Sequence, residues 1–213
     1  MRPTTNFLLL LMLVFLWISP HYSQAANSQT SSSTSFSTNI EFSGCKSTKC
    51  KPAKVEKYKQ VIHSIEEYYS KYNTPNHRLT LEAKMMVISN AIRMAYPDLD
   101  FIGFYHFHPD RGDHELQLGA YSARSKTPQF VFRNGEGIVG TSWKTLEPQL
   151  AKNIPKIKGH VTYDWKIKSE VTVPSFDLDG NFNGVIYLFS ERPYAVDETD
   201  IVCLEDILHY LDY

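Results

Sequence analysis

Residues 169–190 read SEVTVPSFDLDGNFNGVIYLFS, and their pattern indicates the fold class. Its two ends, Glu170 to Pro174 and Asn183 to Ser190, are rich in the β-branched and aromatic residues that strands favour. The polar segment between them, Asp177 to Asn181, contains the Asp and Gly residues typical of a turn. The stretch therefore predicts two strands of an antiparallel sheet.

The flanking sequence predicts helices on both sides of further strands. Apolar residues at three-and-four spacing predict amphipathic helices over Val55–Tyr72 and from Leu81 to about Tyr96, the second capped by Thr80 and stopped by Pro97. Together these elements predict an α+β domain over residues 55–213, with the antiparallel sheet packed on the N- and C-terminal helices. The other expected elements are a hairpin of Phe101–His108 and Glu115–Ser122, a strand over Gln129–Phe132, a short helix opening at Gly135 to Gly140 and running through Lys144, and a last helix capped by Asp197.

The first 54 residues are expected to lie outside that domain. Arg2 precedes an apolar run from Phe7 to Ile18, and the small residues Ser23 and Ala25 follow, as in a cleavable secretory signal over residues 1–25. A retained anchor is the weaker alternative because 12 apolar residues fall short of the roughly 20 that cross a bilayer. Residues 26–54 are rich in Ser and Thr and read as a disordered linker. We expect a secreted or periplasmic protein with no membrane span after signal cleavage.

The three cysteines fit an exported protein. Cys45 and Cys50 flank a short polar turn, and an oxidising compartment would join them in a disulfide. The alternative, half of a metal site, lacks a second ligand pair. Cys203 falls within the apolar pattern of the last helix, which predicts a buried, inert thiol.

Composition and motifs exclude several function classes. The 22 Lys and Arg residues nearly balance 23 Asp and Glu, giving a formal charge of −1, and no basic run marks a nucleic-acid or anionic-membrane surface. We predict no nucleic-acid partner and no cofactor. His106, His108 and His114, with Asp110 and Asp113, could suggest a metal, but they lack a recognised ligand spacing, and a polar strand end explains them. We predict no metal site.

Six short motifs occur in order along the predicted domain. They are Asp100-Phe101-Ile102-Gly103-Phe104-Tyr105, Leu116-Gln117-Leu118-Gly119, Gly135-Glu136-Gly137-Ile138-Val139-Gly140, Gly159-His160-Val161-Thr162-Tyr163-Asp164, Ser169-Glu170-Val171-Thr172-Val173-Pro174 and Gly184-Val185-Ile186. With these motifs, the chain over roughly residues 55 to 211 resembles a GAF domain of the free methionine-(R)-sulfoxide reductase type. That resemblance implies a GAF-like fold with a ligand-type cavity on the sheet face away from the helices. It also implies a cytoplasmic family that reduces free methionine sulfoxide with cysteines.

The catalytic part of the resemblance fails. The family places thiols where this chain has Val139 and Tyr163, and a third in the loop leading to Phe130, where residues 125–129 contain none. A thiolate must attack the sulfoxide sulfur and a second thiol must resolve the intermediate, which neither Val nor Tyr can do. The resemblance therefore predicts a pseudoenzyme with no catalytic residue.

The binding part of the resemblance is partly kept. Glu170 retains a family carboxylate, whereas Tyr187 and Phe189 stand where the family has two more. An aromatic cavity with one carboxylate could hold an amino-acid-like, cationic or aromatic molecule through contacts between a cation and a ring face. The predicted ligand-binding residues are Phe101, Tyr105, Val139, Tyr163, Glu170, Tyr187 and Phe189.

Two other functions remain open at this point. If Tyr163, Tyr187 and Phe189 simply fill the cavity, the domain is a protein-interaction or dimerisation module. A homodimer would form through the terminal helices, as the resemblance implies, and the many tyrosines of the first helix would suit such an interface. The third alternative is an enzyme of unrelated chemistry in the same pocket.

Overall fold

The computed structural model describes residues 50–74, 76–108, 112–124, 129–160 and 162–212. The chain divides into two units, Met1–Ile40 and Glu41–Tyr213, and every described residue belongs to the second unit. The predicted signal peptide, most of the predicted linker and Cys45 lie outside the described residues. Their export, processing and disulfide roles therefore stay predictions.

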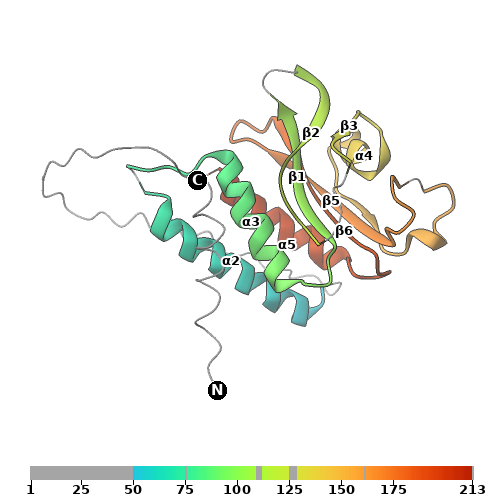
Figure 1. The fold of residues 1–213 in the computed structure, drawn as a ribbon, viewed down its shortest axis with the longest axis horizontal. Helices are drawn as coiled ribbons and strands as arrows, with labels where there is room; N and C mark the ends of the chain where they lie inside the picture. Colours follow the sequence, from blue (N-terminus) through green and yellow to red (C-terminus); the bar gives the residue numbers. More distant parts are fainter. Residues whose placement is uncertain (1–49, 75, 109–111, 125–128, 161, 213) are drawn as a thin grey trace, which may run out of the picture. The chain divides into compact units, whose positions relative to one another are not determined.

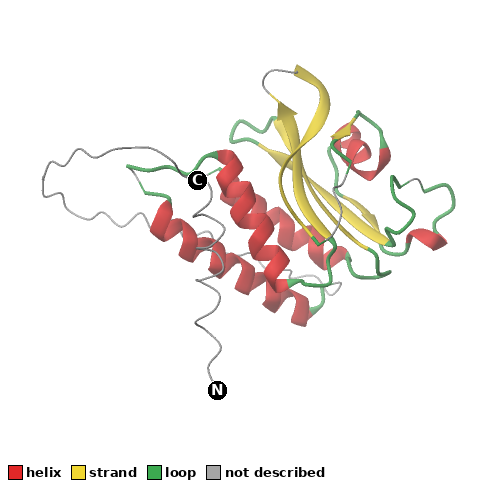
Figure 2. Ribbon diagram, in the orientation of Figure 1, coloured by secondary structure: helices red, strands yellow, loops and turns green. Residues whose placement is uncertain are grey.

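The described elements confirm the α+β class (Figures 1 and 2). Helices α3 and α5 lie against one face of the sheet, α2 packs on α3 and α5, and the short helix α4 lies on the other face of the sheet. In chain order the helices are α2 (Pro52–Tyr72), α3 (Leu81–Ala95), α4 (Gly137–Thr145), the 3-10 turn η1 (Ile154–Lys156), α5 (Glu198–Leu208) and η2 (His209–Leu211). The strands are β1 (Phe101–His108), β2 (Gly112–Ala123), β3 (Val131–Phe132), β4 (Gln149–Ala151), β5 (Ser169–Phe176) and β6 (Phe182–Ser190).

The six strands form one antiparallel sheet in the order β3-β2-β1-β6-β5-β4. Tyr187 of β6 lies opposite Gly103 of β1 and Thr172 of β5, and Phe189 lies opposite Phe101 and Glu170. Because side chains alternate along a strand, this register places Tyr187, Phe189, Phe101 and Glu170 on one face. The intervening Ile102, Phe104, Ile186 and Leu188 are buried on the face that α3 and α5 cover.

The helices form for the reasons that the sequence suggests. In α2 the buried residues fall at three-and-four spacing, so one stripe of the helix meets the core. Pro52 starts α2 three residues before the predicted start, since a proline at the first helical position loses no hydrogen bond. Thr80 caps α3 through its hydroxyl, which accepts from the Ala83 N–H at 3.2 Å, as predicted. The buried residues of α2 are Tyr58, Val61, Ile62, Ile65 and Tyr69.

Two short elements differ from the predictions. The expected strand over Gln129–Phe132 is reduced to Val131–Phe132. The Gln129 carbonyl accepts a hydrogen bond from Tyr105, and its side-chain amide donates to the Val131 carbonyl and to Glu136, so Gln129 does not join the strand. The strand Gln149–Ala151 was not predicted, since three residues show no alternation, and it forms by pairing with β5. Helix α4 begins at Gly137, whose φ of +59° suits glycine.

A buried charge cluster joins the start of α2 to the start of α5. The Lys54 ammonium lies 2.5 Å from an Asp200 oxygen and 3.2 Å from Asp197, and the Tyr58 hydroxyl donates to Asp200 at 2.8 Å. Burial alone would raise the pKa of Asp197, but hydrogen bonds from Lys51 and Thr199 and the charge of Lys54 lower it to about 2. The cluster therefore holds the two ends of the domain together as ion pairs.

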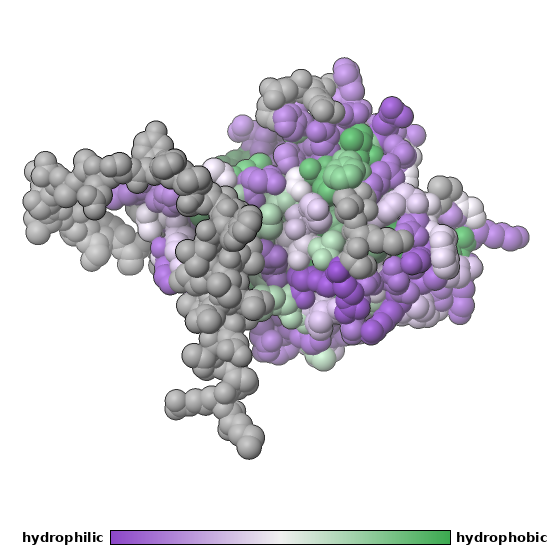
Figure 3. Space-filling view, viewed as in Figure 1, coloured by the Kyte–Doolittle hydropathy of each residue, from purple (hydrophilic) through white to green (hydrophobic). Residues whose placement is uncertain are grey.

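The surface facing the viewer in Figure 3 is mostly hydrophilic. None of the helices within the described ranges is both long and apolar enough to cross a membrane. Cys203 is free and buried, which confirms the predicted burial, and burial raises its pKa to about 12, which disfavours the reactive thiolate.

Lys54→Met keeps the aliphatic stem but leaves the carboxylate of Asp200, only 2% exposed, without its cation. We expect this change to lower the free energy of unfolding by about 3 kcal/mol, because an unpaired buried charge is costly. Lys59→Met is the matched control on the same helix, where the ion pair with Glu56 is exposed and should contribute under about 0.5 kcal/mol. Urea denaturation measures both, and equal losses would contradict a stabilising role for the cluster.

Candidate functional site

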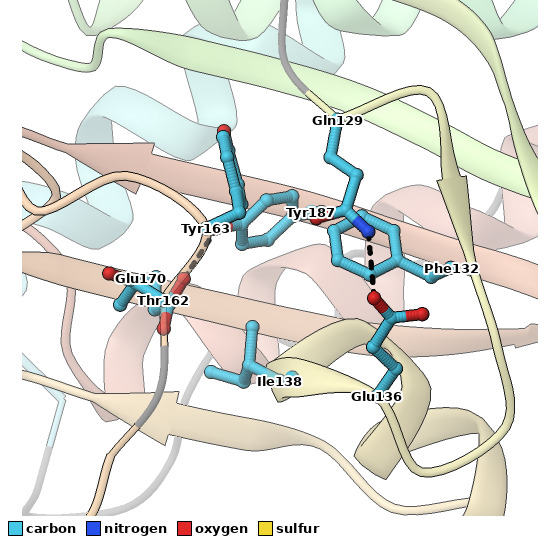
Figure 4. Close-up of a pocket in the computed structure, with 9 residues that line it drawn as sticks. Gln129, Phe132, Glu136, Ile138, Thr162, Tyr163, Glu170 and Tyr187 are labelled. Carbon is cyan, nitrogen blue, oxygen red and sulfur yellow. Dashed lines mark hydrogen bonds between the residues drawn. The ribbon is translucent and has the colours of Figure 1, made fainter.

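A cavity of about 130 Å³ lies on the sheet face that α4 covers. Tyr187 and Glu170 form its floor on two adjacent strands, and the start of α4 and the loop before β5 form its walls (Figure 4). Glu136 and Tyr163 are exposed, so the cavity opens to solvent between them. The lining residues are Gln129, Phe132, Glu136, Gly137, Ile138, Thr162, Tyr163, Glu170 and Tyr187.

Glu170 is the buried polar centre of this cavity. Its side chain is only 2% exposed. One carboxylate oxygen lies 2.5 Å from Nε2 of His160, and the other accepts the hydroxyl of Tyr187. A buried carboxylate is costly unless its oxygens are hydrogen-bonded and its charge is compensated. Both conditions are met here by the protein itself.

The protonation states around Glu170 follow from burial and from its charge. The hydrogen bond with Glu170 raises the pKa of His160 and favours the imidazolium. Burial, with the nearby Glu170 charge, raises the pKa of Tyr187 well above 10, so that hydroxyl stays protonated and donates. Burial likewise raises the pKa of Tyr163, and Glu170 adds to that shift.

A second polar group lines the opposite wall. The Gln129 amide donates to Glu136 at 3.0 Å, and the Arg133 N–H donates to the other Glu136 oxygen at 3.0 Å. The Tyr105 hydroxyl donates to the Gln129 carbonyl at 2.6 Å and holds this residue in place. Among the described residues, no cation pairs with Glu136. Its carboxylate therefore carries uncompensated charge at the opening.

The turn before α4 depends on close backbone approach. The Gly135 N–H donates to the Gly140 carbonyl at 2.8 Å, and the Gly140 N–H donates to the Glu136 carbonyl at 2.8 Å. A Cβ on Gly140 would lie 2.1 Å from the Arg133 carbonyl oxygen, so only glycine fits there. This packing sets the position of Glu136 at the cavity.

The volume limits what the cavity can hold. Ligand pockets usually enclose roughly 300 to 1,000 Å³, and a cavity of roughly 150 Å³ takes a benzene-sized molecule. At about 130 Å³ this cavity accepts a molecule of few heavy atoms, or one end of a larger ligand.

The structure places three of the seven predicted ligand-binding residues at the cavity: Tyr163, Glu170 and Tyr187. The other four, Phe101, Tyr105, Val139 and Phe189, belong to the hydrophobic cluster beside it. In that cluster the Phe101 and Phe189 rings stack with centroids 5.2 Å apart. Aromatic packing therefore occupies space on this face that a ligand would otherwise take.

Sequence reasoning missed His160, Thr162, Gln129 and Glu136 as site residues. His160 and Thr162 stand in the Gly159 to Asp164 motif beside Tyr163, and Glu136 stands in the Gly-Glu-Gly turn. Their roles depend on tertiary contacts that no spacing reveals, since His160 lies ten residues before its partner Glu170 in an irregular loop.

The described residues contain no cluster of three His, Cys, Asp or Glu side chains placed to hold a metal. His106 instead contacts the Phe107 carbonyl through Nδ1 at 3.0 Å and lies 3.6 Å from Glu82 through Nε2. Asp110 lies outside the described residues, and the absence of a metal site stays a prediction.

Similarity to known proteins agrees with the fold and with the motifs. The free methionine-R-sulfoxide reductase of Saccharomyces cerevisiae is 31% identical over 121 residues, which cover 57% of this chain and 66% of that protein. A crystal structure of a putative GAF sensor protein from Burkholderia vietnamiensis superposes with a TM-score of 0.62 over 74% of this chain and 92% of that one, at 23% identity. The chain has the GAF fold. It is related to the free methionine-R-sulfoxide reductases and to GAF domains.

A second relative covers more of the GAF domain. GAF domain-containing protein A of Dictyostelium discoideum is 25% identical over 162 residues, which are 76% of this chain and 94% of that protein. The match to the yeast reductase spans just under two thirds of the yeast protein's length. No family model matches the chain. The expected GAF fold is thus confirmed.

None of the nine residues that line the cavity is a cysteine.

His160→Gln tests the pair at the centre of the site. Because the pKa of His160 is raised in the folded state, the pair adds stability that is fully present below about pH 6.5 and is lost as pH rises through the folded-state pKa. We therefore expect the substitution to cost more unfolding free energy near pH 5.5 than near pH 9. The same substitution in a Glu170→Gln background is the control, and there the pH dependence should shrink. An equal cost at both pH values would contradict the pairing.

Proposed function

We propose that this chain is an exported, catalytically inactive GAF-fold relative of the free methionine-R-sulfoxide reductases, and that it binds a small amino-acid-like molecule through its amino group. The observation that carries this proposal is the polar lining of the cavity: two carboxylates, Glu136 and Glu170, with no cysteine and no lysine or arginine among the lining residues. Such a site attracts a positive charge and lacks the thiol that sulfoxide reduction needs.

The two carboxylates have different roles in this proposal. Glu170 already has His160 and Tyr187 as partners, so it shapes the floor and contributes little free charge. Glu136 pairs with no described cation, and only neutral N–H groups reach it. The ammonium group of a ligand would therefore lie at Glu136. A short side chain would enter between Phe132, Ile138 and Tyr187.

Glu136→Gln keeps the size of the side chain and removes the charge. Titration calorimetry and thermal shifts with methionine, both methionine sulfoxides, other amino acids and quaternary amines would first identify the ligand class. We expect the variant to weaken binding of an amine ligand at least about tenfold, since a charge-assisted hydrogen bond contributes roughly 1.5 to 3 kcal/mol. Glu147→Gln, exposed just beyond the end of α4, removes the same charge away from the lining and should leave the affinity unchanged. An equal effect of both variants would argue against an amine at Glu136.

The loss of reductase activity has its own test. We expect no reduction of free methionine-R-sulfoxide above the protein-free rate in the presence of a dithiol reductant, because Cys203 is buried with a raised pKa. Turnover that is abolished by Cys45→Ser, Cys50→Ser or Cys203→Ser would overturn the proposed inactivity.

A protein-interaction module is the second candidate. Two observations favour it: the cavity is small, and both carboxylate oxygens of Glu170 already have hydrogen-bond partners within the protein, so they need no ligand. No thermal shift with any compound, even at high concentration, would favour this function over small-molecule binding.

A further inference from the structure

The loop between β4 and β5 concentrates positive charge that the composition of the whole chain conceals. Residues 152–168 contain five lysines and a single acidic residue, Asp164, whereas the full chain is nearly neutral. The lysines are spaced two to eight residues apart, so no run of basic residues marks them. They are Lys152, Lys156, Lys158, Lys166 and Lys168.

Backbone hydrogen bonds gather these lysines on one part of the surface. The Ile154 N–H donates to the Lys168 carbonyl at 2.9 Å, which joins the two ends of the loop. The Tyr194 N–H donates to the Lys152 carbonyl at 2.6 Å, which adds the segment after β6. We call this surface the lysine patch, comprising the five lysines with Ile157, Trp165 and Tyr194. The segment that carries η1 lies at the right of Figures 1 and 2.

Most of the charge in the lysine patch is uncompensated. Lys152 pairs with Glu198 at 2.8 Å. The other four lysines form no ion pair with any carboxylate among the described residues. The positive charge also affects Tyr194. Hydrogen bonds from Asn153 and Lys156, together with the charges of Lys156 and Lys152, lower the pKa of the Tyr194 hydroxyl.

Large apolar side chains are exposed among these lysines. Trp165 is 77% exposed, Tyr194 54% and Ile157 42%. The ammonium groups of Lys166 and Lys168 lie 5.9 and 5.4 Å from the Trp165 ring centroid, and that of Lys156 lies 5.9 Å from the Tyr194 ring centroid. Tyr194 also has a φ of +60°, a conformation that residues other than glycine rarely adopt. Such backbone strain is concentrated at functional positions.

We propose that the lysine patch docks the domain on an anionic phospholipid surface. Trp and Tyr favour the boundary between headgroups and acyl chains, and exposed Ile157 can enter the same layer. Lysines supply the attraction to anionic headgroups, about 1 kcal/mol each near the surface. Residues 152–168 contain no arginine. Arginine is the residue that binds phosphates and bases through two parallel hydrogen bonds, so its absence from this segment favours attraction to a membrane surface over nucleic-acid recognition. None of the patch residues lines the cavity, although Thr162 and Tyr163 of the same loop do.

Co-sedimentation with vesicles tests the proposal on the full chain. The protein is mixed with vesicles of phosphatidylcholine alone, or with about a third of phosphatidylglycerol added. The readout is the ratio of partition into anionic over zwitterionic vesicles, because the apolar run Phe7 to Ile18 would bind both kinds alike. We expect a ratio well above one that falls toward one in high salt.

Lys158→Gln combined with Lys166→Gln removes two charges with little risk to folding, because neither ammonium group forms a hydrogen bond or ion pair with a residue that the structure describes. We expect the ratio to fall about 25-fold, roughly fivefold for each lysine. Lys59→Gln combined with Lys71→Gln changes the net charge equally on α2 and should leave the ratio unchanged. Trp165→Ala, which leaves the charge unaltered, should weaken partition into anionic vesicles.

Three results would overturn the proposal. A wild-type ratio near one would show that the patch does not select anionic lipid. Equal losses in the two double variants would show that net charge, and not this surface, decides partition. Binding of RNA or DNA that is lost in the patch variant, without vesicle selectivity, would replace the lipid surface with a nucleic acid. Thermal unfolding of each variant confirms that it is folded before partition is compared.

Discussion

The candidate site depends on one buried carboxylate. Glu170 is 2% exposed, and the cost of removing it from water is met only because His160 and Tyr187 hydrogen-bond its two oxygens. This interaction joins β5 to β6 and to the loop that precedes β5. The position of that loop in turn defines one wall of the cavity and the arrangement of the lysine patch.

The residues around Glu170 explain why the cavity is small. Tyr187 points its hydroxyl at the carboxylate, and its ring contacts those of Phe101, Tyr105 and Phe189. Aromatic packing of this kind leaves about 130 Å³ above the floor. The remaining free charge lies at Glu136, which is exposed. In the binding mode that we propose, the ammonium group of a ligand lies there and only a short side chain enters the cavity.

Much of the fold could be predicted from local patterns. The three-and-four spacing of α2 and α3, the Thr80 cap and the alternation along β1, β5 and β6 each follow from short-range rules, and the structure confirms them. The short β4 and the shortened β3 could not be predicted, because a strand of two or three residues exists only through its partner. Three of the predicted site residues line the cavity, whereas Phe101, Tyr105, Val139 and Phe189 share its face but pack beside it.

Residue types and their spacing are enough to predict the α+β class, the order of the long elements, the face on which the aromatic residues gather, and the lack of cysteines in the reductase-like motifs. These properties depend on residue type and on periods of two and 3.6, which are local. Three other features depend on the folded arrangement: His160 compensates Glu170, Glu136 reaches the cavity, and five scattered lysines form one surface. Hydrogen bonds and charge compensation act over a few ångströms in space, and chain folding sets those distances independently of spacing along the sequence.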